Sequence, residues 1–302
     1  MNVLVTGGSG LIGMAVRKSV AARGHKVISV DVTDYGRGDG DLTLASLTDR
    51  PGLERLVDDT GIEAIIHCGA ISGPMLAKGQ PLMLVDANIV GTAHLLDLAR
   101  TRNMRRFVFC SSISVYGSVG DAVITEDRPL HPTSVYGATK VASEQLIEGF
   151  ATEFGLSGIS LRIARVYGPY RRANCHLGSI IRDAAANRIT EIATRADFPF
   201  HYVYVDDVAE ALATALEAAA IPAFAYTVSG PAPLTMPEIK SVAERTIPGA
   251  AIRIVPGEDD VPDVQRVFDL GRIKADLGWA PSRDIARGLA EYAAAINAGQ
   301  SA

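Results

Sequence analysis

Short apolar runs rich in β-branched residues alternate with segments of helical periodicity through the first half of the chain. The apolar runs predict strands at 2–7, 25–31, 63–70, 105–112 and 157–168. Apolar positions that recur at helical spacing predict helices at 11–22, 51–61, 81–102 and 134–152. Continuous apolar strands separated by helices are typical of a parallel sheet covered on both faces. The pattern therefore predicts an α/β fold with a doubly wound parallel sheet.

The alternation loosens after residue 166. The segment 167–178, YGPYRRANCHLG, is rich in turn formers and arginine and predicts an excursion out of the sheet. A strand and a helix return over 201–219, with Asp206 and Asp207 where an N-cap belongs. From about residue 232, short elements punctuated by proline and glycine predict a smaller lobe over the carboxyl edge of the sheet. We expect two discontinuous units, 1–166 with about 201–230 and about 167–200 with 231–302.

Composition narrows the class of protein. The chain has 302 residues, 48% of them hydrophobic, and a net charge of −5 without a long basic run, which argues against nucleic acid as a partner. Three widely spaced cysteines, Cys68, Cys110 and Cys175, favour reduced thiols and a cytoplasmic location. Scattered histidines, with neither CxxC nor HExxH, predict no metal site. No leader is evident, and the uncharged stretch 218–237 contains four prolines, so we expect no membrane span.

A glycine-rich motif, TGGSGLIG at 6–13, lies between the first predicted strand and the first helix. Gly7, Gly10 and Gly13 allow a tight turn and a close approach to a pyrophosphate, which the helix N-terminus attracts. Asp31 closes the second strand, where a carboxylate accepts ribose hydroxyls and repels a 2′-phosphate. This arrangement predicts a Rossmann-type site for NAD rather than NADP. Arg37 would weaken that preference, and a plain turn role for Asp31 is the alternative.

A second motif is TSVYGATKVASEQ at 133–145. Tyr136 and Lys140 are one helical turn apart and share a face, and Gly137 and Ala138 leave space between them. A tyrosine has a pKa near ~10, and a neighbouring ammonium together with the positive nicotinamide of NAD⁺ stabilises its phenolate. The pair therefore predicts a base with a lowered pKa. The alternative is a tyrosine packed at a helix start beside a solvated lysine.

Together these motifs carry a resemblance. The glycines, VFCSSISVYG, TEDRPLHPTSVYGATK and LRIARVYGP, in this order, resemble the extended short-chain dehydrogenase/reductases, in particular the NAD-dependent epimerase/dehydratase family. The likeness runs from Met1 to the C-terminal DLGRIKADLGWAPSRDIARGLAEY. It implies that Ser112, Tyr136 and Lys140 are catalytic, with Tyr136 removing a hydroxyl proton while hydride leaves a sugar carbinol for NAD. It also implies a homodimer that pairs helices 81–102 and 134–152 across a twofold axis.

The resemblance further assigns the cofactor contacts. The family's pyrophosphate loop, ribose carboxylate, adenine pocket and helix Asn behind the active site fall on residues of matching type. The HCGA turn beside the cofactor departs slightly from the family's His-x-Ala-Ala at Cys68 and Gly69. With Tyr136 and Lys140, the cofactor contacts are Gly7, Gly10, Leu11, Ile12, Gly13, Asp31, Asp41, Leu42, Gly69, Ala70 and Asn88.

Departures from the family pattern bear on the substrate. Family dehydratases carry Asp-Glu where this chain has Ile113 and Ser114, so dehydration is disfavoured. Nucleotide-sugar members have Asn in place of Arg165, and Arg and Asp in place of Phe200 and His201, so the expected diphosphate clamp is partly missing. Candidate substrate contacts are Ser72, Ser112, Ile113, Arg165, Arg171, Arg172, His176 and Arg266.

The arginines among these candidates suit a diphosphate or the carboxylate of a smaller sugar acid, and a solvated loop is the alternative. Some epimerase relatives pair a His near position 176 with a Cys, and here that Cys position, near Ile113, holds none. The prediction is an NAD-dependent enzyme acting on a sugar, a sugar acid or a nucleotide sugar. A nucleotide-sugar 4-epimerase and a dehydrogenase of a free sugar or sugar acid both remain open. A catalytically silent NAD-sensing protein is the alternative, and it should lack Tyr136 or Lys140.

Overall fold

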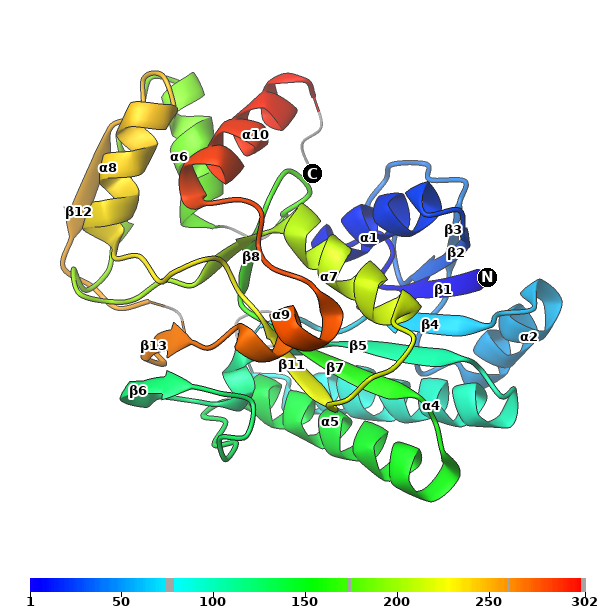
Figure 1. Cartoon of the computed structure of the whole chain (residues 1–302). Coiled ribbons are helices and arrows are strands. Elements are labelled where there is room, and N and C mark those ends of the chain that lie inside the picture. Colours follow the sequence, from blue (N-terminus) through cyan, green and yellow to red (C-terminus); the bar gives the residue numbers. More distant parts are fainter. Residues whose placement is uncertain (74–78, 173–174, 260, 300–302) are drawn as a thin grey trace.

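A seven-stranded parallel sheet organises the computed structural model, which describes residues 1–73, 79–172, 175–259 and 261–299 (Figure 1). The strand order is β11-β7-β5-β4-β1-β2-β3. The strands are β1 (Asn2–Thr6), β2 (Lys26–Asp31), β3 (Leu42–Leu44), β4 (Ala64–His67), β5 (Arg106–Ser112), β7 (Gly158–Ile163) and β11 (Ala225–Val228). From β1 the chain adds β2 and β3 on one side of the sheet, and β4 then pairs with β1 on the opposite side. Ligands of such sheets bind at this switch point, outside the carboxyl ends of the strands.

Both faces of the sheet are buried, as the continuous apolar strands predict. In β1, Val3 and Val5 join the core on one face and Leu4 joins the core on the other. Helices α1 (Leu11–Ala22) and α7 (Val205–Glu217) pack together over the first face, while α4 (Gly91–Thr101) and α5 (Val135–Phe154) cover the second (Figure 1). Helix α2 (Arg50–Thr60) follows β3. The doubly wound α/β class is confirmed.

The predicted helix 81–102 is interrupted. It begins as α3 (Pro81–Leu84), passes through a π-helical turn at Val85–Val90 and continues as α4. Such turns insert a residue into a helix and often accompany functional sites. Among the described residues, Pro81–Thr101 is the one helix long and apolar enough to cross a membrane. Its packing against α5, β4 and β5 accounts for part of that apolar character, while Leu82, Met83 and Val90 are exposed.

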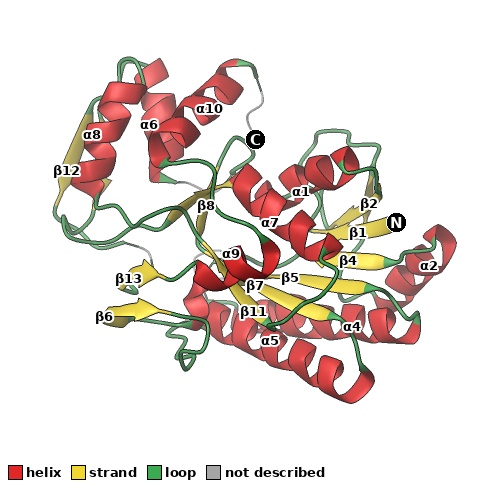
Figure 2. Cartoon of the chain, in the orientation of Figure 1, coloured by secondary structure: helices red, strands yellow, loops and turns green. Residues whose placement is uncertain are grey.

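The predicted strand 157–168 is in fact two strands. Strand β7 ends at Ile163, and β8 (Arg165–Tyr167) lies outside the main sheet (Figure 2). It pairs instead with β10 (Tyr202–Tyr204). The apolar run continues through this break, so periodicity could not reveal it. The remaining elements surround β8 and the carboxyl edge. They are η2 (Ile113–Val115), β6 (Val119–Ile124), α6 (His176–Ala185), β9 (Thr190–Ala193), α8 (Met236–Thr246), β12 (Ile252–Val255), β13 (Gln265–Phe268), α9 (Gly271–Leu277) and α10 (Ile285–Asn297).

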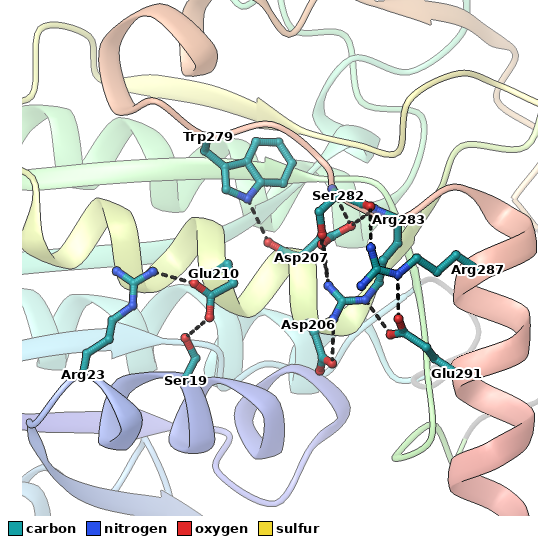
Figure 3. A network of polar contacts seen from close by, with 10 residues as sticks. All are labelled: Ser19, Arg23, Asp206, Asp207, Glu210, Trp279, Ser282, Arg283, Arg287 and Glu291. Atoms are coloured by element: carbon teal, nitrogen blue, oxygen red, sulfur yellow. Dashed lines mark hydrogen bonds and ion pairs between the residues drawn. The ribbon is translucent and has the colours of Figure 1, made fainter.

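The N-cap prediction for Asp206 and Asp207 is wrong by two and three positions. Tyr204 is the N-cap of α7, and both carboxylates lie in the first turn, near the positive helix end. Asp207 is buried and accepts hydrogen bonds from Ser282 and from the backbone and guanidinium of Arg283 (Figure 3). Arg283 also pairs with Glu291 of α10. The carboxylate therefore anchors the C-terminal segment to α7.

Candidate active site

Helix α5 presents Tyr136 and Lys140 to the carboxyl edge of the sheet. Ser134 is its N-cap, and the Ser134 side chain accepts a hydrogen bond of 3.1 Å from the backbone N–H of Gly137. A Cβ at Gly137 would lie 2.6 Å from the carbonyl oxygen of Ser114, so the close approach of α5 to this turn requires glycine. Tyr136 is 9% exposed and Lys140 only 3%. The alternative of a solvated lysine is therefore wrong.

The two side chains do not yet form an ion pair. The Lys140 ammonium donates a 2.7 Å hydrogen bond to the carbonyl oxygen of Cys110 and lies 5.8 Å from the centroid of the Tyr136 ring. Burial lowers the pKa of Lys140 to about 8. Burial raises the pKa of Tyr136 to about 12, and a hydrogen bond with Ser112 opposes this rise. Without the positive charge of oxidised cofactor, desolvation of the phenol dominates and Tyr136 is protonated. The predicted lowering of its pKa by Lys140 and the nicotinamide together stays a prediction.

Ser112 ends β5 beside these residues. Its hydroxyl accepts a 3.1 Å hydrogen bond from the backbone N–H of Ser114, which starts the turn η2. The same hydroxyl stabilises the phenolate of Tyr136 and so opposes the rise in its pKa. The structure thus brings Ser112, Tyr136 and Lys140 together from one strand and one helix. Ile113 is half-buried and follows Ser112 in η2, and it offers no acid or base.

Asn88 supports this site from behind. Its amide oxygen accepts from the backbone N–H of Ile71 at 2.9 Å, and its NH₂ group donates to Thr139 on α5 and to the carbonyl of Ile71. Both amide donors are therefore used within the protein. Asn88 therefore ties the loop after β4 to the helix of Tyr136, and its contact to the cofactor stays a prediction.

The glycine-rich turn has the geometry that a dinucleotide requires. Gly7 has φ +67°, and a Cβ there would lie 2.8 Å from the backbone of Cys68 and Gly69. A Cβ at Gly13 would lie 2.0 Å from the carbonyl oxygen of Gly7. Gly10 is the N-cap of α1 and has no side chain to cap the first backbone N–H groups of that helix. These N–H groups, which include those of the predicted contacts Leu11 and Ile12, suit a phosphate.

Asp31 faces the same turn. Its carboxylate accepts hydrogen bonds from the backbone and hydroxyl of Ser9, at 3.1 and 2.7 Å, and from the N–H of Val32. Arg37 donates to the carbonyl oxygen of Ser9, and its second guanidinium nitrogen is buried with no hydrogen-bond partner among the described residues. A role confined to the turn after β2 is wrong for Asp31. A carboxylate and a partly unpaired guanidinium fit the polar adenosine end of NAD.

Two further predicted contacts border this turn. The carbonyl of Asp41 accepts from Ser29, while its side chain is exposed. Leu42 opens β3 and is half-buried. A Cβ at Gly8 would lie 3.1 Å from the Leu42 side chain, so Leu42 packs directly beside the glycine turn.

A buried histidine, which carried no assigned role in the sequence, holds the HCGA turn. His67 hydrogen bonds Thr6 at 2.6 Å and Thr92 at 3.0 Å, and Thr6 also accepts from the N–H of Gly69. Burial, followed by the charge of Lys140, lowers the pKa of His67 to about 3, so the ring is neutral. The network fixes Gly69, and with it Ala70, against the pyrophosphate turn.

The cysteines are free, as expected. The thiol of Cys68, just after β4, lies 3.1 Å from that of Cys110 on the neighbouring strand β5, next to Lys140. Their mutual hydrogen bond and burial raise the pKa of Cys68 well above its ordinary value. Cys68 is therefore a neutral thiol at physiological pH.

Arg165 is not a free diphosphate clamp. Its guanidinium is bidentate to the carboxylate of Asp259, at 2.5 and 3.2 Å, and donates to the carbonyl of Val261. The same guanidinium lies over the rings of Phe198 and Phe200. A substrate anion at this position would have to compete with a carboxylate that is already in place.

The other predicted substrate contacts are dispersed. Arg171 donates to the carbonyl of Val166, and Arg172 stacks 4.0 Å from the centroid of Tyr35, in the loop after β2. His176 begins α6 with its ring edge against Phe200. Arg266 lies exposed on β13, and Ser72 is exposed in the loop after β4. Arg172 therefore faces the adenosine side of the site, away from the position expected of a sugar contact.

Comparison with known proteins places this geometry in a family. The model of the NAD-dependent epimerase/dehydratase family matches residues 3–227. UDP-glucose 4-epimerase of Corynebacterium glutamicum is 30% identical over 234 residues, which cover 72% of this chain and 71% of the relative. UDP-glucuronate 4-epimerase 1 of Arabidopsis thaliana is 27% identical over 331 residues, covering 97% and 76%.

Among solved structures, UDP-glucose 4-epimerase of Thermotoga maritima, determined with UDP-glucose, superposes with a TM-score of 0.88 at 26% identity, covering 99% of both chains. The Thermus thermophilus enzyme, determined with NAD, has the same TM-score at 25% identity and covers 98% of this chain and 99% of its own. The glycine turn, Asp31 and the Ser112, Tyr136 and Lys140 cluster fit that cofactor. The chain therefore belongs to the NAD-dependent epimerase/dehydratase family, and it is an NAD-dependent enzyme of the extended short-chain dehydrogenase/reductase type.

Proposed function

We propose that this enzyme is a nucleotide-sugar 4-epimerase acting on a UDP-hexose. The observation that carries the proposal is the cluster of Ser112, Tyr136 and Lys140 at the end of β5, beside a glycine turn that fits NAD. The similarity to UDP-glucose and UDP-glucuronate 4-epimerases over most of the chain supports the substrate class.

The residues of the cluster divide the work. NAD held by the glycine turn and Asp31 supplies a hydride acceptor and donor. The hydroxyl of Ser112 orients the C4 hydroxyl of the sugar, and Tyr136 takes its proton. The keto sugar then turns so that its other face meets the cofactor. Tyr136 returns the proton to the C4 oxygen when the sugar is reduced again. Lys140, buried beside the phenol, stabilises the phenolate when it forms.

Epimerisation requires that the keto sugar stays bound and intact. Elimination of water needs a further acid and base next to Ser112, and Ile113 and Ser114 provide neither. Residues 1–166 with 201–230 would hold NAD, and 167–200 with 231–302 would hold the sugar nucleotide.

A second candidate is a dehydrogenase of a free sugar or sugar acid. The observation in its favour is the pairing of Arg165 with Asp259, which leaves this position without a free cation for a diphosphate. An enzyme that releases the ketone or lactone would also have to release reduced cofactor after each turnover.

We further propose a cytoplasmic homodimer without nucleic acid or membrane as a partner. Apolar side chains are exposed along the segment that covers the second face of the sheet: Leu82, Met83, Val90 and Val135. Burial of these side chains against a second copy would remove them from water. Sedimentation of the purified protein tests this, and a monomer at micromolar concentration would contradict it.

The function is tested by offering two substrate sets to purified protein with NAD⁺. UDP-glucose and UDP-glucuronate are followed by chromatography of their C4 epimers, and free sugars and sugar acids by the appearance of NADH. We expect interconversion of a UDP-sugar with no net NADH. Stoichiometric NADH from a free sugar or acid would establish the dehydrogenase instead, and inactivity on both sets would favour the NAD-sensing alternative.

A further inference from the structure

A buried ionic pair lies directly behind the catalytic cluster, outside the chemistry described above. Glu144 follows Lys140 by one turn of α5 and is fully buried, and Arg162 of β7 is 5% exposed. The Arg162 Nε lies 3.1 Å from both carboxylate oxygens of Glu144, and Nη2 lies 2.8 Å from Oε2. This fork geometry makes several charge-assisted hydrogen bonds to one carboxylate.

The pair connects the two elements that carry the catalytic residues. The hydroxyl of Ser111, the residue before Ser112 on β5, donates a 2.5 Å hydrogen bond to Glu144 Oε1. Glu144 therefore joins the helix of Tyr136 and Lys140 to the strand of Ser112 at the level of the site.

Arg162 extends the connection to the turn after Ser112. Its Nη1 donates to the hydroxyl of Tyr116 at 3.1 Å and to the carbonyl of Glu126 at 2.8 Å. The Glu126 carboxylate in turn accepts from the N–H of Thr227 in β11. One guanidinium thus fixes both the catalytic helix and the segment that follows the catalytic strand.

Packing alone does not require charges here. Farther along the same helix–sheet interface, Ile147 packs with Phe107 and Leu95 in an apolar core. A buried ion pair contributes less to stability than apolar residues of similar volume often do, because both charges lose their hydration. The stronger effect of the pair is on the position of α5, because only one arrangement of this helix on the sheet satisfies every hydrogen bond.

We propose that Glu144, held by Arg162, is a positioning residue that sets the register of α5 against β5 and so aligns Tyr136 and Lys140 with Ser112. The inference rests on the proposed function where it is tested by kcat. The measurement of Tyr136 ionisation does not depend on that function. The carboxylate of Glu144 also raises the pKa of Lys140 and so opposes the effect of burial. The other titratable groups facing Lys140 are Tyr136 on the same helix, Cys110 on β5, and His67 and Cys68 at the end of β4.

The test uses the NAD⁺-loaded enzyme with both charges removed together, as Glu144→Gln with Arg162→Met, so that no unpaired ion is left in the core. We expect kcat to fall at least tenfold with KM changed by less than threefold. The alkaline limb of the kcat–pH profile should move to lower pH, because Lys140 loses its neighbouring carboxylate. Glu144→Asp, which keeps the charge and shortens the side chain, should lower kcat while leaving that limb in place.

A matched control removes another buried carboxylate–guanidinium pair, Asp207→Asn with Arg283→Met, which anchors the C-terminus on α7. Both double variants should lower Tm, and only the Glu144 pair should change the pH profile. Wild-type kcat and pH profile in the Glu144 double variant would overturn the proposal.

A readout that needs no substrate separates this inference from the proposed function. The phenolate of Tyr136 is followed by ultraviolet absorbance with NAD⁺ bound, after subtraction of the Tyr136→Phe titration. We expect the Glu144 double variant to ionise Tyr136 at a pH at least one unit higher than wild type. An unchanged titration would overturn the positioning role, even if the natural substrate proves not to be a nucleotide sugar.

Discussion

The ammonium of Lys140 lies 2.7 Å from the carbonyl oxygen of Cys110, and 5.8 Å from the centre of the Tyr136 ring. The protein itself therefore holds a protonated phenol, with a pKa of about 12, beside an ammonium whose pKa is about 8. Burial pushes both groups toward their neutral forms. A positive charge placed near the phenol would favour the phenolate, so the base should become active only with oxidised cofactor in place.

Tyr136→Phe tests the base directly. Removal of the phenol hydroxyl deletes the group that accepts the substrate proton, and we expect kcat to fall by about 10²–10⁴. NAD should remain bound, because the glycine turn and Asp31 are untouched. Turnover by stopped assay and NAD content after gel filtration provide the measurements. Tyr292→Phe, a buried tyrosine of α10, is the control, and turnover that survives in Tyr136→Phe would contradict the assigned base.

Asp31→Ser should relax the choice of cofactor. The carboxylate repels a 2′-phosphate, while the buried, partly unpaired guanidinium of Arg37 would attract one. We expect the ratio of the Kd for NADP to the Kd for NAD to fall at least tenfold, which corresponds to about 1.4 kcal/mol. Fluorescence titration measures both constants. Asp34→Asn, in the same loop, should leave this ratio of Kd values unchanged. An equal fall of the ratio in both variants would show that the net charge of the loop, and not Asp31 itself, sets the cofactor preference.

Gly13→Ala should disrupt the dinucleotide site. The new Cβ would lie 2.0 Å from the carbonyl oxygen of Gly7, and relief of that clash must displace the turn. We expect NAD affinity to drop at least tenfold and Tm to fall. Gly149→Ala in α5 is the matched control, because its Cβ meets nothing within 4 Å and helix propensity should add about 0.5–1 kcal/mol of stability. Normal NAD binding by Gly13→Ala would refute the close packing.

Local spacing was sufficient to predict the elements and the pairing of Tyr136 with Lys140, because both depend on neighbours along one helix. The break between β7 and β8 escaped prediction, since the apolar run continues through Ala164 while the hydrogen-bond partner changes from β5 to β10.

The sequence also does not predict which charged side chains pair with one another. Arg165 was predicted to face substrate, yet its partner Asp259 lies 94 residues away in sequence. The sequence predicts a cap at Asp207, whereas Asp207 binds Arg283, 76 residues away. No periodicity encodes such pairs, because the tertiary fold alone decides which charges meet.

His67 should make the protein acid-sensitive. Its ring, neutral between Thr6 and Thr92, has a pKa of about 3, below the ordinary value of 6.5, because it is buried. As pH falls below 6.5, His67 takes up a proton in the unfolded chain but stays neutral in the folded chain. The free energy of unfolding therefore decreases as pH falls below 6.5. Between pH 7 and pH 5, wild type should lose about 2 kcal/mol more than His67→Gln in urea unfolding. Equal losses in both proteins would mean that the ring is protonated within the fold.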